Sequence, residues 1–334
     1  WVMLIVLALE RKLVVYTSDD LLQWREASSF GPAGASADTI WEVPVLLPLP
    51  VDGEPGAQRW VLFISINGGT PWGGSGVQYF VGDFDGERFV ADPADPAAHA
   101  DAVRWLDHGR DFYAPLPFAR VAGRHAERTL WLGWMNNWDY ARDVPSAPWR
   151  GQLSLPRELS LARTGEGWRV VQRPAQALQQ ARGPALLALQ ACPAADAALA
   201  LAKLQARGRH WRATLRAPRS ALVQPLVLLF FTGGGAPVRV GFDTVLDSYF
   251  IDRRKPAPSF AGESEMHHAP RDRSRDEVEF EVWVDGCTVE VFADGGTVLL
   301  SDIVFPDPAA EGIALWHGSA NPVLTAFSLE PLRS

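Results

Sequence analysis

Cysteine is scarce in this sequence, since the 334 residues include only Cys192 and Cys287. Two cysteines so far apart provide neither the paired spacing of a zinc site nor a framework of disulfide bonds, so free thiols are the simplest interpretation. The adjacent His267 and His268 stand in a charged, loop-like stretch without a third ligand. Phosphate-binding Gly-rich loops and the G-x-S-x-G nucleophile motif are also absent. The sequence therefore predicts no metal and no other cofactor.

Lysine is equally scarce, and basic runs are limited to "DRRK" and "RDRSR". The formal net charge is -8. A chain with this balance is a poor partner for nucleic acid or for an anionic membrane surface, so neither is expected to bind. A neutral small substrate fits the composition better.

Long apolar runs are missing as well. The opening "WVMLIVLAL" is too short to span a bilayer, and it lacks the basic start and the cleavage site of a signal peptide. It is better interpreted as a buried strand. The chain starts on Trp1 rather than methionine, which favours a natural polypeptide that is longer than these residues.

Short apolar or alternating runs closed by turn residues fill the sequence, whereas helical periodicity is nearly absent before residue 174. These features predict an all-β protein, with a propeller or barrel over residues 1–173. A short helix-compatible linker is predicted over 174–183, and a β-rich domain with sandwich-like strand spacing over 184–334. The run "AADAALALAKLQARG" has helical propensity, but its apolar positions alternate, so a strand is the preferred prediction there. "DFDG" is expected to be a hairpin turn.

One glutamate stands in an apolar run, "DTIWEVPVLL", where Glu42 lies between Trp41 and Val43. A strand-end glutamate that reaches solvent is one interpretation. The other is a general acid, because an apolar wall disfavours the ionised carboxylate and lets it hold a proton near neutral pH. Glycoside hydrolysis needs such an acid together with a second, ionised carboxylate. The residues alone leave the identity of that partner open among Asp111, Asp139, Asp143 and Glu158.

Aromatic residues are abundant, with 14 tryptophans, and several stand beside polar residues in "RDFYAPLPF" and "GWMNNWDYARDVPSAPWRGQ". Flat aromatic faces stack on the C–H faces of sugars, and neighbouring Asp, Asn and Arg side chains can bind hydroxyl groups. The alternative is that the tryptophans fill the core and Asp111 caps a turn. In combination with Glu42, the pattern indicates a carbohydrate site.

Five stretches resemble glycoside hydrolase family 32, especially its levanases, inulinases and β-fructosidases: "IWEVP", "NGGTPWGGSGVQYFVGDFDGERF", "RDFYAPLPF", "LGWMNNWDYARDVPSAPWRGQLSLPRELSL" and "TVEVFADGG". The resemblance implies a five-bladed β-propeller followed by a β-sandwich, and retaining hydrolysis of β-fructofuranosyl bonds in levan, inulin or sucrose. It implies that Glu42 is the general acid/base, that Asp111 holds fructosyl hydroxyls, and that Trp134 or Trp138 lines the pocket. It also favours a secreted or periplasmic location, whereas the sequence itself specifies neither location nor oligomeric state.

The sequence departs from the family pattern at several places. Val43 stands where the family usually has cysteine, and Val45 replaces a common aspartate. The family's nucleophile motif, Trp-Met-Asn-Asp-Pro-Asn-Gly, and its Arg-Asp-Pro motif do not occur. We therefore expect an N-terminally truncated chain that lacks the first blade and part of the second. Such a chain is expected to be inactive because it lacks the nucleophile. A fructosyltransferase and a non-catalytic fructan-binding protein remain alternatives.

Overall fold

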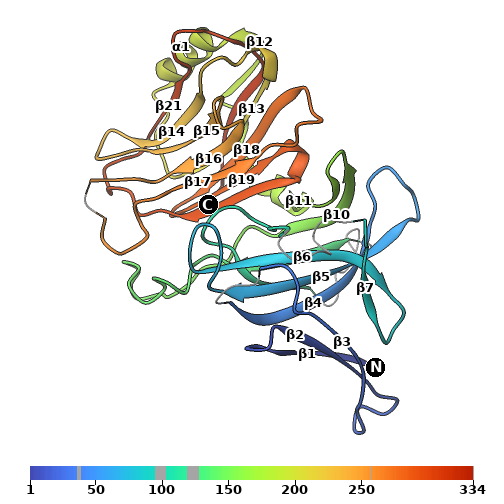
Figure 1. The fold of residues 1–334 in the computed structure, drawn as a ribbon. Coiled ribbons are helices and arrows are strands. Elements are labelled where there is room, and N and C mark those ends of the chain that lie inside the picture. The colour runs from blue at the N-terminus through green and yellow to red at the C-terminus, as the bar shows by residue number, and fades with distance from the viewer. Residues whose placement is uncertain (36–38, 95–102, 119–127, 257, 334) are drawn as a thin grey trace.

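The computed structural model describes residues 1–35, 39–94, 103–118, 128–256 and 258–333. Strands dominate it throughout, so the all-β prediction is confirmed. The sheets of the N-terminal half lie below those of the C-terminal half in Figure 1, and the single α-helix among the described residues, α1 (Ala194–Leu204), lies at the far end of the upper part.

The N-terminal half forms three antiparallel sheets in which each strand pairs with its neighbour in sequence. The first contains β1 (Val2–Leu7), β2 (Lys12–Thr17) and β3 (Arg25–Phe30); the second β4 (Ile40–Pro50), β5 (Gln58–Asn67), β6 (Ser75–Phe84) and β7 (Phe89–Ala91); the third β8 (Tyr113–Pro117), β9 (Thr129–Trp134), β10 (Arg157–Thr164) and β11 (Gly167–Pro174). None of these three sheets is closed on itself. Short turns join some of these strands, such as β1 to β2 and β10 to β11, whereas residues 135–156 separate β9 from β10.

The C-terminal half contains a six-stranded sheet in the order β12-β22-β13-β18-β19-β20 and a five-stranded sheet in the order β17-β16-β15-β14-β21. Their strands are β12 (Leu187–Pro193), β13 (His210–Pro218), β14 (Leu226–Thr232), β15 (Val238–Asp243), β16 (Ser248–Asp252), β17 (Met266–Pro270), β18 (Glu277–Asp285), β19 (Thr288–Ala293), β20 (Val298–Ile303), β21 (Gly312–Trp316) and β22 (Val323–Pro331). Both sheets contribute to one apolar core, for instance through Leu215 and Phe280 from one and Leu228 and Val240 from the other.

Residues 194–204 are an α-helix, so the strand predicted for this segment is wrong. Ala194, Ala197 and Leu201 are buried, and they share one face because helical neighbours recur every three to four residues. Pro193 occupies the position before the first turn, and Gln205 ends the helix in the left-handed conformation. Alternating Ala and Leu satisfied a strand pattern by coincidence, whereas helix propensity was the correct signal.

Two other local predictions are confirmed. "DFDG" forms the turn between β6 and β7, where the Asp85 carboxylate accepts hydrogen bonds from the backbone N–H groups of Glu87 and Arg88. The predicted short helix lies at Gln176–Ala181 as a 3-10 helix, and two further 3-10 turns occur at Arg219–Ala221 and Asp294–Gly296. By contrast, His267 and His268 lie on strand β17 rather than in a loop.

A buried arginine joins the two halves of the molecule. The Arg157 side chain on β10 is fully buried, and its guanidinium donates to Glu290 Oε2 at 2.6 Å and to Ser301 Oγ at 2.7 Å, both in the C-terminal half. It also donates to Asp107 Oδ2 at 3.2 Å and lies over the ring of Phe112. Buried charges are retained in proteins where they are paired in this way.

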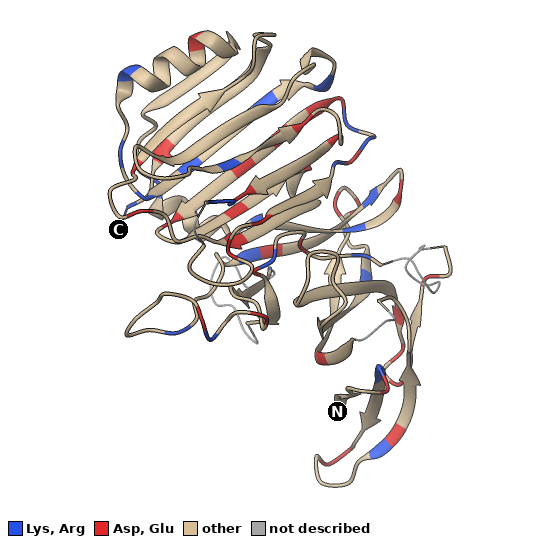
Figure 2. Cartoon of the chain, turned by 60° about the vertical axis from the view of Figure 1, so that its left-hand side comes forward, with Lys and Arg blue, Asp and Glu red and all other residues tan. Residues whose placement is uncertain are grey.

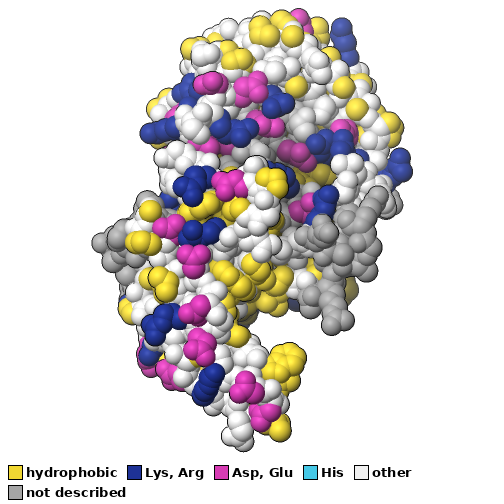
Figure 3. Space-filling model, turned by 90° about the vertical axis from the view of Figure 1, so that its right-hand side faces the viewer, with side chains coloured by type: hydrophobic (Ala, Val, Ile, Leu, Met, Phe, Trp, Pro, Cys, Tyr) yellow, Lys and Arg dark blue, Asp and Glu magenta, His cyan; other side chains and the backbone are white. Residues whose placement is uncertain are grey.

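Charged side chains of both signs alternate along the strands and over the visible surface (Figures 2 and 3). This distribution offers no broad patch of one sign on the faces shown. In the part of the chain that the structure describes, no helix combines the length and the apolar character that crossing a bilayer requires.

Candidate active site

Glu42 lies near the start of β4, next to a fully buried aromatic residue. Trp41 is inaccessible to solvent and packs with Phe30 and Phe80, while Glu42 is half-buried. The pairing of β4 with β5 shifts register directly after Glu42, and Val43 has a φ of +42°. Positive φ is unusual for a β-branched residue, and bulges of this kind re-aim side chains next to functional sites. The backbone thus adopts a strained conformation to present this carboxyl group.

Tyr113, the first residue of β8, is the partner of Glu42. Its hydroxyl donates a hydrogen bond to Glu42 Oε2, across 71 positions of sequence. Burial, together with the Glu42 carboxylate, raises the pKa of Tyr113 far above its ordinary value, so the phenol remains a donor at every physiological pH. A bulge again follows directly, and Ala114 has a φ of +46°. The same backbone device therefore presents both members of the pair.

Two tryptophans extend the site from this pair. Trp134, at the end of β9, is paired in register with Tyr113, and their ring centroids are 6.3 Å apart in an edge-to-face arrangement. Trp138 follows in the next loop, with its centroid 5.1 Å from that of Trp134. Because Trp138 is 50% exposed, it offers an apolar face to solvent at the end of the row formed by Tyr113, Trp134 and Trp138. Such a face suits the C–H surface of a sugar.

Asp111, expected to hold substrate hydroxyls, does not lie with these residues. Its side chain is fully buried where the two halves of the chain meet. It accepts hydrogen bonds from the Tyr140 hydroxyl, from Arg253 Nη1 at 2.9 Å and from the backbone N–H of Ile303 at 2.9 Å. Both carboxylate oxygens are thus occupied by protein groups, and this geometry gives no support to direct contact with a sugar.

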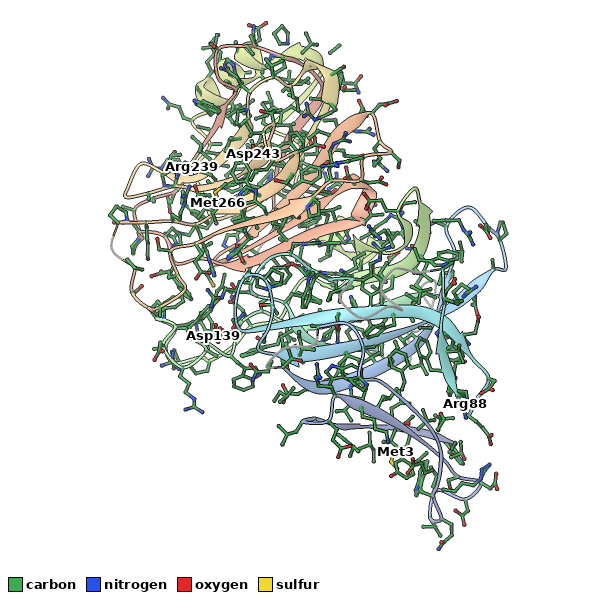
Figure 4. All side chains as sticks on the ribbon, viewed as in Figure 1. Met3, Arg88, Asp139, Arg239, Asp243 and Met266 are labelled. Carbon is green, nitrogen blue, oxygen red and sulfur yellow. The ribbon has the colours of Figure 1, made fainter. Side chains whose placement is uncertain are left out.

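Two of the other candidate carboxylates are held by arginines. Asp139 pairs with Arg110 at 2.6 Å, Glu158 pairs with Arg128 and accepts the backbone N–H of residue 176, and Asp143 is exposed. In Figure 4, Asp139 lies at the end of the β4–β7 sheet where β6 begins, opposite the hairpin that carries Arg88. Among the described residues, none of these carboxylates hydrogen-bonds to the Glu42–Tyr113 pair.

Two residues of the site were missed in the sequence. Tyr113 belongs to the stretch "RDFYAPLPF", two positions after Asp111, but only the contact between β4 and β8 identifies it as the partner of the acid. Asn137 is fully buried before Trp138, and its amide donates to the backbone carbonyl of Arg110 at 2.9 Å. It also accepts the N–H of Asp139 at 3.0 Å, which fixes the loop that carries Trp138. The two adjacent asparagines between Trp134 and Trp138 were the feature of the sequence that could have indicated this role.

Glu42 belongs to no metal centre in the described part of the chain. No group of three or more His, Cys, Asp or Glu side chains there is arranged to hold a metal ion. A cavity of about 540 Å³ lies elsewhere, between residues 172–182 and the six-stranded sheet, where Arg212, Glu281 and Trp283 line it. The groups that the structure brings together around Glu42 are a carboxyl group, a phenol and aromatic rings.

An acid held by a tyrosine, with an exposed tryptophan in the same aromatic row and an all-β scaffold, is typical of carbohydrate-active proteins. The chain belongs to glycosyl hydrolase family 32: residues 1–174 match the family's N-terminal domain and residues 191–330 match its C-terminal domain. The expected family resemblance is thereby confirmed.

Named relatives agree with this assignment. The chain is 37% identical over 340 residues to a levanase from Bacillus subtilis (strain 168), covering all of this chain and 48% of the levanase. It is 32% identical over 311 residues to an extracellular exo-inulinase from Aspergillus niger, covering 92% of this chain and 57% of that enzyme. The crystal structure of an exo-inulinase from Aspergillus awamori superposes with a TM-score of 0.87 at 26% identity, covering the whole chain and 65% of that structure. The chain thus spans about half the length of the curated relatives it matches.

Proposed function

We propose that this chain carries the acid/base side of a retaining β-fructofuranosidase site that acts on levan, inulin or sucrose. Glu42 protonates the oxygen of the leaving group in the first step and activates water in the second. The observation that carries the proposal is the hydrogen bond from the Tyr113 hydroxyl to Glu42 Oε2. The relatives named levanase and exo-inulinase support the substrate class.

The geometry assigns different tasks to the two oxygens of Glu42. Tyr113 occupies Oε2, which leaves Oε1 to transfer the proton. Trp134 and Trp138 supply the apolar surface on which the fructosyl unit rests. The ring of Trp134 lies 6.3 Å from that of Tyr113, and the ring of Trp138 lies 5.1 Å from that of Trp134. The reaction needs no metal, because the proton and the water are both handled by carboxyl groups.

The same proposal extends to the architecture. Each N-terminal antiparallel sheet is a blade of a five-bladed propeller, and the five- and six-stranded sheets form a β-sandwich. In that arrangement β4 and β8 are the inner strands of neighbouring blades, which explains why Glu42 and Tyr113 meet although neither strand pairs with the other.

We further propose that the nucleophile is not among the carboxylates of residues 1–334, so that the chain alone does not hydrolyse fructans. Retaining glycosidases place their two carboxyl groups about 5 Å apart. Asp111, Asp139 and Glu158 are instead paired with arginines, and none of them hydrogen-bonds to Glu42 among the described contacts. A fructan-binding protein without hydrolysis is the second candidate function, favoured by the exposed face of Trp138.

Release of fructose from levan, inulin and sucrose tests both parts. The assay compares the 334-residue chain with the same chain extended by any coding sequence that precedes Trp1 in its gene. We expect release only from the extended polypeptide, and a loss of at least about a hundredfold in its Glu42→Gln variant. Glu54→Gln, in an exposed turn, is the matched control and leaves turnover unchanged.

Each proposal has its own contradicting result. Near-normal turnover of Glu42→Gln would remove Glu42 from the acid role. Fructose release by the 334-residue chain that Glu42→Gln abolishes would show that the nucleophile lies within it. Saturable quenching of tryptophan fluorescence by levan oligosaccharides, with no hydrolysis by either polypeptide, would favour the binding protein. Transfer products from concentrated sucrose would indicate a fructosyltransferase.

A further inference from the structure

The segment that leads into β8 is docked on the C-terminal half of the molecule. Residues 107–111 run along β20, the last strand in the order of the six-stranded sheet. The backbone N–H of His108 donates to Leu299 at 2.8 Å, and that of Asp111 donates to Ser301 at 2.9 Å. A Cβ atom at Gly109 would lie 2.1 Å from the Ser301 nitrogen, so only glycine permits this approach. An otherwise open sheet edge is thereby covered by the chain just before the site.

Side chains lock the same segment in place. The backbone N–H of Arg110 donates to Asp302 Oδ1 at 2.8 Å, while the carboxylate of Asp111 accepts the N–H of Ile303. Arg253, whose side chain is 2% exposed, donates Nη1 to Asp111 Oδ2 and Nη2 to the hydroxyl of Tyr140 at 3.0 Å. Arg253, in the C-terminal half, thus holds the Asp111 carboxylate of the N-terminal half. Arg157 makes the reverse connection, because it lies in the N-terminal half and holds a carboxylate of the C-terminal half.

This lock lies two residues from the partner of the acid. Asp111 is followed by Phe112, whose ring packs near Trp131, and then by Tyr113, which hydrogen-bonds to Glu42. Ala114, with its positive φ, follows directly. Tyr113 therefore lies between a segment that is held at Asp111 and a bend in the backbone at Ala114. Displacement of Asp111 therefore displaces Tyr113.

We propose that Arg253 is a positioning residue for the acid: by holding Asp111 it sets the orientation of Tyr113 toward Glu42. The C-terminal half thus contributes to the site although none of its side chains touches the Glu42–Tyr113 pair among the described contacts. Asp111 acts through the backbone rather than on the sugar. The catalytic consequence rests on the proposed function of Glu42, whereas the orientation of Tyr113 does not.

The decisive readout is spectroscopic and needs no turnover. A single 3-fluorotyrosine is placed at position 113 of the 334-residue chain, and its ¹⁹F resonance is compared among variants. Glu42→Gln gives the reference position for a phenol that has lost its carboxylate. We expect Asp111→Asn and Arg253→Gln to move the resonance toward that position. Asp294→Asn is the matched control, because Asp294 is also a buried carboxylate bonded to a tyrosine hydroxyl, that of Tyr249, but lies away from β8.

A kinetic readout accompanies it in the polypeptide that hydrolyses fructan. Asp111→Asn is expected to lower kcat at least about tenfold with little change in KM, because misplacement of a catalytic group slows the chemical step. Asp294→Asn is expected to lower the melting temperature without lowering kcat. If Asp111→Asn or Arg253→Gln fails to fold, Tyr140→Phe replaces them, since it removes one hydrogen bond from each partner and preserves the ion pair.

The possible failures are distinguishable. An unmoved ¹⁹F resonance in folded Asp111→Asn, Arg253→Gln or Tyr140→Phe overturns the positioning role, even where Glu42→Gln abolishes hydrolysis. Equal movement of the resonance in Asp294→Asn overturns it as well, because the effect would then report general loosening. Full turnover of Glu42→Gln would instead overturn the proposed function, and the fluorine result would still decide the orientation of Tyr113.

Discussion

Replacement of Arg157 by methionine is expected to destabilise the junction between the two halves more than any surface charge change. The substitution keeps most of the volume but removes a fully buried guanidinium. It leaves the carboxylates of Glu290 and Asp107, themselves 2–3% exposed, without their cation. Breaking a buried ion pair by removing one partner costs about 3–5 kcal/mol of the free energy of unfolding. For domains of this size that corresponds to a fall in melting temperature of roughly 10 °C.

The loss should depend on pH with a definite sign. Burial raises the pKa of Asp107 and of Glu290, while Arg157 opposes this by lowering both. Without Arg157, the pKa values of both carboxyl groups rise further. A carboxyl group whose pKa is raised in the folded state stabilises the fold at acid pH, and this stabilisation is lost as pH rises through the raised pKa. The deficit of Arg157→Met should therefore be large at about pH 7 and smaller at about pH 5.

Urea unfolding followed by tryptophan fluorescence measures both effects. Arg25→Met is the control, since Arg25 and Glu87 form a pair with both side chains about 60% exposed, and its loss should cost no more than about 1 kcal/mol. Combining Arg157→Met with Asp107→Asn and Glu290→Gln should restore much of the stability, because no buried charge then remains unpaired. Equal losses for Arg157→Met and Arg25→Met, or a deficit independent of pH, would refute this reasoning.

Three further outcomes are expected. Tyr113→Phe should lower turnover of the hydrolysing polypeptide about tenfold or more, the scale of one hydrogen bond to a charged group, and an unchanged kcat would contradict the pairing. Trp138→Ala should weaken fructan oligosaccharide binding about threefold to tenfold in a fluorescence titration, with an unaltered circular dichroism spectrum. For His267, burial lowers the pKa but Asp302 and Glu265 raise it to about 9; its stabilisation is therefore complete below the ordinary value of 6.5 and is lost as pH rises through 9. Replacing His267 by glutamine should flatten the stability profile across that range, and a decline as steep as before would assign the dependence to other groups.

The strands were predictable because they are local features. Runs such as residues 59–66 and 278–285 have β-branched and aromatic composition, and the structure places them in β5 and β18. The segment 194–204 shows the limit of that approach, because its alternating Ala and Leu residues also fit a strand, whereas helix propensity and packing against the C-terminal sheets both favour the helix. The expected closure of five blades stays a prediction.

The site was predictable in part. Glu42 stands out because a carboxylate is unusual in an apolar run. Its proposed role rests on that position in the sequence and on the hydrogen bond from Tyr113. The family resemblance implied that Asp111 holds substrate hydroxyls, yet its partners Arg253 and Ile303 lie 142 and 192 positions away in the sequence. No local pattern reveals such contacts.

The sequence by itself determined the all-β class, the family and the prominence of Glu42, because strand composition and short motifs are properties of neighbouring residues. Only the tertiary structure decided that Tyr113 faces Glu42 and that Asp111 turns away into the junction with the C-terminal half. The physical reason is that successive strand residues point to opposite faces only while the strand is regular. Bulges after Glu42 and after Tyr113 re-aim the side chains, and contacts between sheets remote in sequence then fix which groups meet.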